Sequence, residues 1–139
     1  MTRNDAGSSQ ERREFFRLNY TTPLHFKTYP TRIGRTETAS VGRSRNVSQS
    51  GVLFQTEKNP PQLSSIVWMN LDIRTLTICK EIEKRALIFN NGLLGRVVRV
   101  EEDVNENNLY DIGVCFLTQD QQNSKEIQQV ISQISQTAS

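Results

Sequence analysis

Residues 86–100 read ALIFNNGLLGRVVRV. Two apolar runs flank Asn90-Asn91-Gly92, and both Asn and Gly readily adopt the backbone angles that a tight hairpin turn requires. The pattern predicts a strand at 86–89, a turn, and a second strand from residue 93 to residue 100. The chain is therefore expected to contain an antiparallel sheet.

Further strands are predicted on both sides of this hairpin. Apolar side chains occupy every second position within residues 18–29 and 109–117, which is the period of a half-buried strand. Residues 52–54 form a short apolar strand after a turn. Residues 65–73 are apolar at nearly every position, which is typical of a strand covered on both sides or forming a barrel wall.

The segments between these strands are less regular. Residues 31–44 are rich in Thr, Ser, Gly and Arg and favour an exposed strand or a long hairpin arm. Leu76 and Ile78 are expected to extend the strand at 65–73 past a bend, and a charged link follows. The acidic, Asn-rich residues 101–108 predict a loop.

Single residues add detail to this pattern. Pro23 cannot donate to a sheet ladder, so its strand is expected to lie at an edge or to be broken by a bulge. His25 is off-phase and is expected to face solvent, whereas Trp68 is expected in the core. Cys79 and Cys115 lack metal-ligand spacing, so we interpret both as buried small apolar residues and predict no metal site.

The period changes near the end of the chain. A helical stripe is formed by apolar residues at spacings of three and four: Ile127, Val130, Ile131 and Ile134. Thr118 and Gln121 are expected to form the capping box of this helix. Several short strands followed by one helix predict a mainly β fold, an antiparallel barrel with a helix packed on it. We divide the chain into a disordered tail at 1–10, a barrel domain at 11–118, and a helix with a tail at 119–139.

Charge is distributed unevenly along the 139 residues. The net charge is only +2, but residues 11–45 hold eight Lys or Arg and three acidic residues. This local surplus indicates an anionic ligand, whereas the weak overall charge argues against a general nucleic-acid coat protein. No apolar run approaches the roughly 18 residues of a membrane helix, and no signal peptide is recognised, so we expect a cytoplasmic protein without membrane insertion.

Two polar motifs carry most of the functional information. Arg12, Arg13 and Arg17 precede the first predicted strand, and the segment Asn46-Val47-Ser48-Gln49-Ser50-Gly51 starts a later one. The guanidinium fork of Arg pairs with phosphate or with the O6/N7 edge of guanine and can stack on a purine. Asn and Ser add neutral donors and acceptors, and Gly permits close approach of the backbone. Arg43 and Arg45 lie just upstream and are either ligand contacts or ordinary surface charges.

Together these motifs resemble the signatures of the PilZ domains, which bind the bacterial second messenger cyclic di-GMP. Arg13 and Arg17 match the motif RxxxR, and Asn46, Ser48 and Gly51 match the motif (D/N)xSxxG about thirty residues later. Asn46 stands where Asp is commoner in the family. Asn at this position keeps a hydrogen-bond acceptor but lacks the negative charge of Asp.

The resemblance, which covers roughly residues 11–118, implies a six-stranded antiparallel barrel and a receptor function without catalysis. Arg13 and Arg17 would bind guanine edges and phosphate, Asn46 and Ser48 would hydrogen-bond a guanine or the nearby backbone, and Gly51 would keep the turn open. Arg12 stands where a basic residue in the family accompanies binding of two stacked cyclic di-GMP molecules. The N-terminal segment is expected to be mobile without ligand, to become ordered on binding, and to signal to a protein partner that the sequence does not name.

Two other functions stay open at this point. A small barrel that binds single-stranded nucleic acid would need aromatic residues interleaved with basic ones, but only Phe15 and Phe16 lie near the arginines. A ligand-free PilZ-like adaptor would act through protein contacts, and such relatives generally lack the two motifs. No paired carboxylates, activated nucleophile or cofactor motif can be assembled, so we predict neither enzymatic activity nor a cofactor.

Overall fold

The computed structural model describes residues 18–19, 23–29, 38–57, 59–74, 76–105 and 108–137. Its strands and helices are β1 (Leu18–Asn19), β2 (Pro23–Tyr29), β3 (Thr38–Val47), β4 (Gly51–Glu57), β5 (Ile66–Asn70), α2 (Cys79–Arg85), β6 (Ile88–Phe89), β7 (Gly92–Glu102), β8 (Leu109–Phe116), the 3₁₀ helix η1 (Gln119–Gln121) and α3 (Lys125–Thr137).

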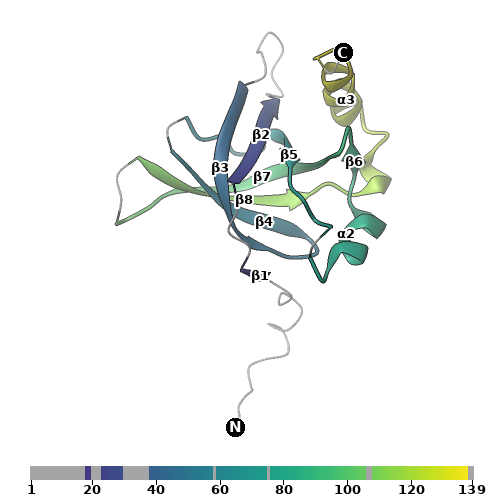
Figure 1. Ribbon diagram of the computed structural model, residues 1–139. Coiled ribbons are helices and arrows are strands. Elements are labelled where there is room, and N and C mark those ends of the chain that lie inside the picture. Colours follow the sequence, from purple (N-terminus) through teal and green to yellow (C-terminus); the bar gives the residue numbers. More distant parts are fainter. Residues whose placement is uncertain are drawn as a thin grey trace.

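Six of these strands close into an antiparallel barrel (Figure 1). The order is β3-β2-β5-β7-β8-β4, and β4 pairs again with β3. The short strand β1 adds to β3, and β6 pairs with β7. Closure removes the free sheet edges that would otherwise invite pairing with other chains. The predicted mainly β barrel with a C-terminal helix is confirmed.

The interior of the barrel is filled by side chains that alternate along the strands. Leu24 and Phe26 of β2, Phe54 of β4 and Ile112 of β8 are all 2% exposed or less. The rings of Phe26 and Phe54 pack with centroids 4.9 Å apart. The exposed His25 lies between two buried neighbours, as its off-phase position predicts.

The prediction that Pro23 marks an edge or a bulge was wrong. Strand β2 is internal, between β3 and β5, and Pro23 is its first residue. Pro23 pairs with Arg43 of β3, whereas the pairing with β5 begins only at His25. Proline is tolerated at the first residue of a strand. Pro23 has no partner residue on β5, so its missing N–H removes no hydrogen bond to that strand.

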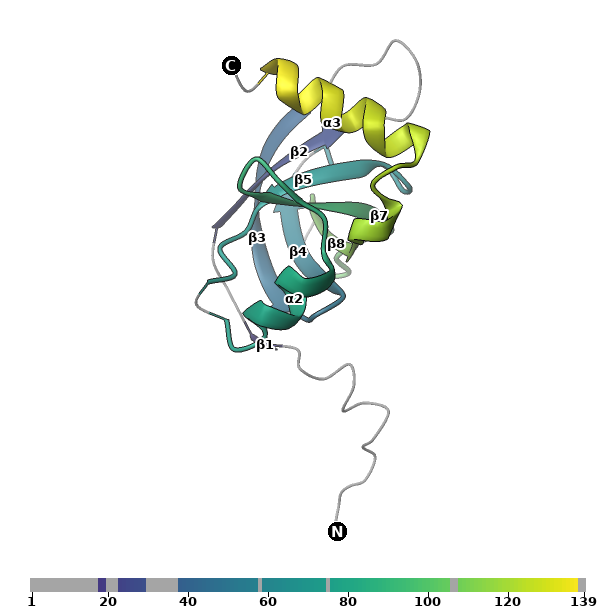
Figure 2. The same cartoon turned by 90° about the vertical axis from the view of Figure 1, so that its right-hand side faces the viewer.

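The segment after β5 was also predicted wrongly. Instead of extending the strand, Leu76 lies in a turn and Ile78 directly precedes the short helix α2, which replaces the predicted charged link. Ile82 is fully buried and packs with Ile78 and Ala86 into the interior cluster. These three residues are four apart, so one face of α2 closes an end of the barrel (Figure 2).

Helix α3 lies across the outside of the barrel (Figure 2). Its predicted stripe is confirmed: Ile127, Val130 and Ile134 are buried, and Ile131 is partly buried. A second apolar cluster forms beneath the stripe from outward residues of the strands and the β6 region: Tyr29, Ile66, Leu87, Leu94 and Leu117.

Trp68 belongs to this outer layer, which corrects its prediction as a core residue. It is only partly buried, its Nε1 donates to the Phe89 carbonyl oxygen at 2.7 Å, and Lys27 Nζ lies 5.9 Å from its ring centroid. On β5 it alternates with the inward Val67 and Met69 and therefore points outward.

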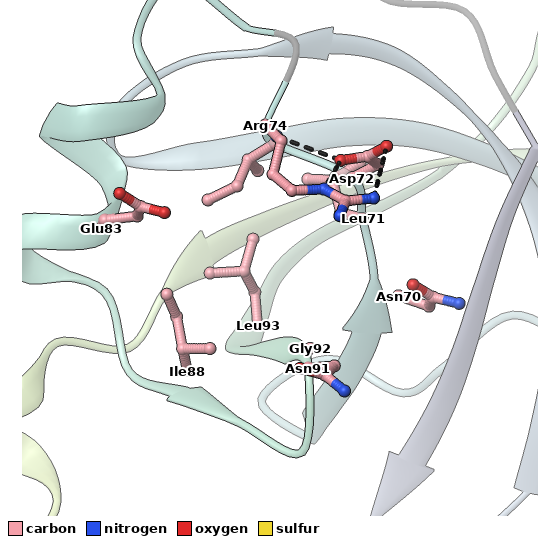
Figure 3. A pocket seen from close by; sticks show the side chains of 10 residues that line it. Asn70, Leu71, Asp72, Arg74, Glu83, Ile88, Asn91, Gly92 and Leu93 are labelled. Atoms are coloured by element: carbon pink, nitrogen blue, oxygen red, sulfur yellow. Dashed lines mark hydrogen bonds and ion pairs between the residues drawn. The ribbon is translucent and has the colours of Figure 1, made fainter.

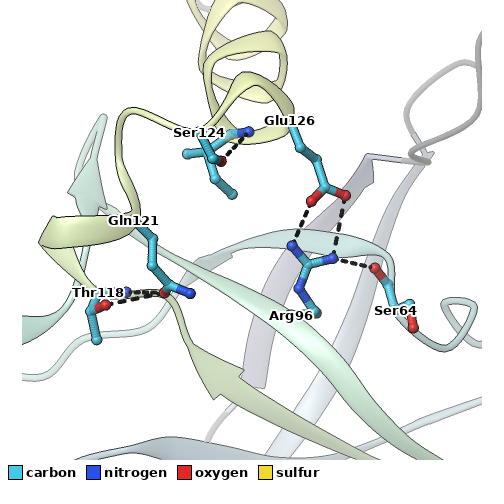
Figure 4. A network of polar contacts seen from close by, with 7 residues as sticks. Ser64, Arg96, Thr118, Gln121, Ser124 and Glu126 are labelled. Carbon is cyan, nitrogen blue, oxygen red and sulfur yellow. Dashed lines mark hydrogen bonds and ion pairs between the residues drawn. The ribbon is translucent and has the colours of Figure 1, made fainter.

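The start of α3 differs from the expectation as well. Gln121 Oε1 accepts from the Thr118 backbone N–H at 2.8 Å, so this pair caps η1 (Figure 4). Ser124 caps α3 instead, because its Oγ accepts from the Ile127 N–H at 3.2 Å. Arg96 of β7 ties the helix to the barrel through Glu126, with Nη2 and Oε1 2.6 Å apart, and Arg96 Nη1 also donates to the Ser64 carbonyl oxygen.

Candidate functional site

A β-bulge in β3 determines which way Asn46 faces. The pairing with β4 shifts between Ser44 and Asn46, so Arg45 is the extra residue. Ser44 is fully buried, and strict alternation from it would place Asn46 inside the barrel. The bulge reverses this phase: Val47 becomes the buried residue, and Asn46 faces outward opposite Leu53.

The turn that follows is organised by the Ser48 hydroxyl. Ser48 Oγ accepts from the backbone N–H groups of Ser50 at 3.3 Å and Gly51 at 3.2 Å, and the Ser48 N–H donates to the Gly51 carbonyl oxygen at 2.8 Å. A serine side chain that binds backbone two and three residues ahead stabilises a tight turn. Ser48 thus has a structural role that does not depend on any ligand.

Position 51 requires glycine because there is no room for a side chain. A Cβ on this residue would lie 2.2 Å from the Val114 carbonyl oxygen of β8, and backbone cannot move aside as a side chain can. Its φ is not in the left-handed region, so the need for glycine comes from the close approach of two strands.

A second bulge lies in β7. Its pairing with β8 shifts between Val97 and Arg99, and Val98 and Arg99 are both exposed, whereas Val97 is buried. Arg99 lies opposite Gly113, and a Cβ on Gly113 would be 3.1 Å from the Arg99 Cβ. The absence of a side chain on Gly113 therefore leaves room for the base of Arg99 against β8.

The two bulges frame a single outward row of residues across four strands. Asn46 pairs with Leu53, Leu53 with Gly113, and Gly113 with Arg99. This row and the adjacent turn form a groove of ≈ 240 Å³. We call it the outer groove, and its lining is Asn46, Ser48, Ser50, Gly51, Val52, Leu53, Val98, Arg99, Gly113, Val114 and Cys115.

Of the predicted site residues, Asn46, Ser48 and Gly51 are brought together in the outer groove. Arg43 lies outside it: it pairs with Gln55 and lines a separate depression of ≈ 360 Å³ that also contains Glu57. Arg45 is exposed at the bulge and lines neither depression.

Arg12, Arg13 and Arg17 lie outside the described residues. Leu18, the residue that follows Arg17, pairs with Val47, and Asn19 pairs with Asn46. The chain directly after the first motif therefore runs antiparallel to the start of the second.

Both cysteines differ from their predicted burial. Cys115 is exposed and lines the outer groove, because it alternates with the inward Val114 and Phe116 on β8. Cys79 is partly buried at the start of α2. Its partial burial and the nearby Glu83 carboxylate raise the pKa of the Cys79 thiol, which keeps it protonated at neutral pH.

A larger depression, of ≈ 440 Å³, lies between residues 70–74, α2 and the β6–β7 hairpin (Figure 3). Its one lining arginine, Arg74, is bound by Asp72 at 3.0 Å between Nε and Oδ1, and Glu83 contributes a second carboxylate. Among the described residues that line the outer groove, Arg99 is the one charged side chain, and its ion-pair partner Glu101 is not a lining residue. An anionic ligand is therefore favoured at the outer groove.

Comparison with protein families matches residues 11–133 to the PilZ domain. The chain belongs to the PilZ family. PilZ domains are known cyclic di-GMP-binding modules and act as receptors, not as enzymes. The comparison with curated proteins found no match. Within the described part of this PilZ domain, no helix is long and apolar enough to span a bilayer.

Sequence reasoning missed Arg99 and Val98 as groove residues of this PilZ domain. The signal was present in Val97-Val98-Arg99, because two adjacent valines interrupt the alternation expected of a strand with one apolar face. Which of the two valines turns outward depends on the pairing with β8.

Proposed function

We propose that this PilZ domain is a cyclic di-GMP receptor that binds its ligand at the outer groove through RxxxR and NxSxxG. The observation that carries the proposal is the bulge at Arg45, which turns Asn46 outward into the groove that Ser48 and Gly51 also line. The described lining combines neutral hydrogen-bonding groups with one cation, Arg99, which suits a ligand with guanine edges and phosphates.

Arg13 and Arg17 are assigned to guanine edges and phosphate. Support comes from β1, whose pairing of Asn19 with Asn46 ties the chain after Arg17 to the strand that bears the second motif. Arg99 is a further candidate contact, since it is the one arginine lining the groove within the described residues. Arg43 and Arg45 lie near the groove without lining it, so we place them outside the direct contacts.

Two further features belong to the proposal. Arg12 adds a cation where two stacked ligands carry a charge of about −4, so we propose two cyclic di-GMP molecules per chain. Arg12→Leu should move the titration ratio toward one, and a ratio of one in the unaltered protein would refute the role of Arg12.

The N-terminal segment would carry the signal. Its arginines repel one another until an anion lies between them, so ligand binding should order residues 1–17 and change the surface offered to a protein partner in the cytoplasm. Amide exchange across this segment should slow when cyclic di-GMP is added. Equal exchange rates with and without ligand would exclude this switch.

The deciding experiment is calorimetric titration with cyclic di-GMP, with GMP and a single-stranded oligonucleotide as competitors of different class. Binding of cyclic di-GMP alone supports the receptor, binding of the oligonucleotide supports a nucleic-acid-binding barrel, and binding of none supports an adaptor that acts through protein contacts.

A matched pair of variants then locates the site. Asn46→Ala should weaken cyclic di-GMP binding, because it removes an amide from the outer groove, whereas Asn70→Ala removes an exposed amide from the depression beside α2. A loss of affinity confined to Asn70→Ala would move the site to the larger depression.

A further inference from the structure

Arg99 of the outer groove is already bound to a carboxylate of its own strand. Its Nη2 lies 2.7 Å from Oε1 of Glu101, and the side chains are 54% and 56% exposed. The two residues are two positions apart on β7, so they share its outward face. The hydrogen bond and the charge of Arg99 lower the pKa of the Glu101 carboxyl, which is therefore ionised at neutral pH.

The strand register shows from which side Glu101 holds the arginine. Arg99 lies opposite Gly113, and Glu101 lies opposite Asp111 in the next outward row. The pair formed by Gly51 and Cys115 is on the other side of the Arg99 row. Glu101 thus binds the guanidinium from the side away from the Ser48 turn.

A second carboxylate near Arg99 is engaged elsewhere. Asp111 Oδ1 accepts from Gln55 Nε2 at 2.7 Å, and the same amide lies 3.5 Å from Asp103 Oδ2. Glu101 is accordingly the carboxylate that hydrogen-bonds directly to Arg99.

We propose that Glu101 is an internal competitor of the ligand. In the free protein it binds the guanidinium group of Arg99 that an anionic or guanine acceptor of the ligand takes on binding, so the Arg99–Glu101 pair lowers the affinity of the outer groove for the ligand. Carboxylate, phosphate and the guanine edge all accept from the planar guanidinium group, so a ligand acceptor that takes the Nη2 donor displaces Glu101 from it. This inference rests on the proposed cyclic di-GMP site.

The exchange is feasible because the pair is weak. Both side chains are more than half exposed, and exposed ion pairs have small net free energies that salt screens further. The release of Arg99 should therefore change affinity by no more than about fivefold.

The test is a titration of the full chain with cyclic di-GMP. Glu101→Gln should bind about two- to fivefold more tightly than the unaltered protein, because the amide competes less well for the guanidinium. Glu102→Gln is the matched control: it removes the same charge at the neighbouring, exposed position of β7. The gain in affinity of Glu102→Gln should be smaller, since this substitution alters only the general electrostatic field around the groove.

A double variant isolates the competition from general electrostatics. If Glu101 acts through Arg99, then adding Glu101→Gln to Arg99→Ala should give no further gain in affinity. The proposal would be contradicted if the gain in cyclic di-GMP affinity persists in the Arg99→Ala background. Equal gains for Glu101→Gln and Glu102→Gln would contradict it as well. Thermal melts of each variant establish that the barrel remains folded.

The outcomes separate the inference from the proposed function. If the unaltered protein does not bind cyclic di-GMP, the receptor itself is refuted. If it binds and Glu101→Gln leaves the affinity unchanged, the receptor stands and only the competitor is refuted.

Discussion

The two outer faces of the barrel are built for different purposes. The helix-covered face consists of outward residues of β2, β5 and β7, Tyr29, Ile66 and Leu94, buried under α3. The open face consists of the row Asn46, Leu53, Gly113 and Arg99, which lines the outer groove.

Strand β7 contributes to both faces and shows what separates them. Leu94 is fully buried beneath α3, whereas Arg99, after the bulge, is exposed. Large apolar side chains stabilise the fold only when another element covers them. Glycines and polar residues leave a face free for a ligand. Substitutions on the covered face should therefore affect stability, and those on the open face should affect binding.

The largest effect is expected on the covered face. Ile127 is 1% exposed, so Ile127→Ala should lower the free energy of unfolding by about 2–5 kcal/mol. Cyclic di-GMP affinity of the folded protein should not change. Gln129→Ala, on the exposed side of α3, is the control and should leave the denaturation midpoint unaltered. If Ile127→Ala lowered the affinity for cyclic di-GMP without lowering stability, the proposed difference between the two faces would be contradicted.

Gly51 lies on the open face, where substitutions are expected to affect binding. Gly51→Val should be an exception that impairs both folding and binding. Its Cβ would meet the Val114 carbonyl oxygen at 2.2 Å, and overpacking costs about 1–3 kcal/mol or more. In Gly113→Ala the added Cβ would lie 3.1 Å from the Arg99 Cβ, which is a milder contact, so the melting temperature should fall less. A Gly51→Val protein with unchanged stability and affinity would remove the steric argument.

Arg13→Ala and Arg17→Ala should affect binding alone. The loss of one bidentate contact costs about 1–3 kcal/mol, or roughly 5- to 150-fold in the Kd for cyclic di-GMP, with little change in stability. Titration and a thermal melt measure the two quantities. Arg85→Ala, an exposed arginine of α2, serves as control. Unchanged affinity in both variants would exclude RxxxR from the site.

Ser48→Ala should produce a smaller effect in both measurements. It removes an acceptor for two turn N–H groups, and a neutral hydrogen bond contributes about 0.5–1.5 kcal/mol. Ser48→Thr keeps the hydroxyl and should recover most of the loss. If the threonine variant recovers stability but not affinity, Ser48 contacts the ligand in addition to holding the turn.

The smallest effect is expected for the ion pair that anchors α3. Glu126→Gln weakens its bond to Arg96, which is about one-third exposed, so the free energy of unfolding should fall by less than about 1 kcal/mol. High salt should diminish the difference, and ligand affinity should stay constant. A larger loss would mean that the pair, more than the apolar stripe, holds the helix.

Much of this molecule follows from local patterns. The period of two located β2 and β8, and a turn signal before a short apolar run located β4. The spacing of Ile127, Val130 and Ile134 located α3 and its buried side. Helix α2 was missed because it is one short segment with five charged residues among seven, and its apolar packing residues extend beyond its ends to Ile78 and Ala86.

The sequence by itself determined the residue types of the site and their spacing, and Ser48 and Gly51 share one turn that the Ser48 hydroxyl closes locally. Only the tertiary structure decided which face Asn46 occupies and that Arg99 joins it. A bulge is a mismatch between two paired strands, so its position depends on the partner strand as much as on the strand that contains it. The register of β3 on β4 and of β7 on β8 set both bulges, and with them the row of residues that forms the outer groove.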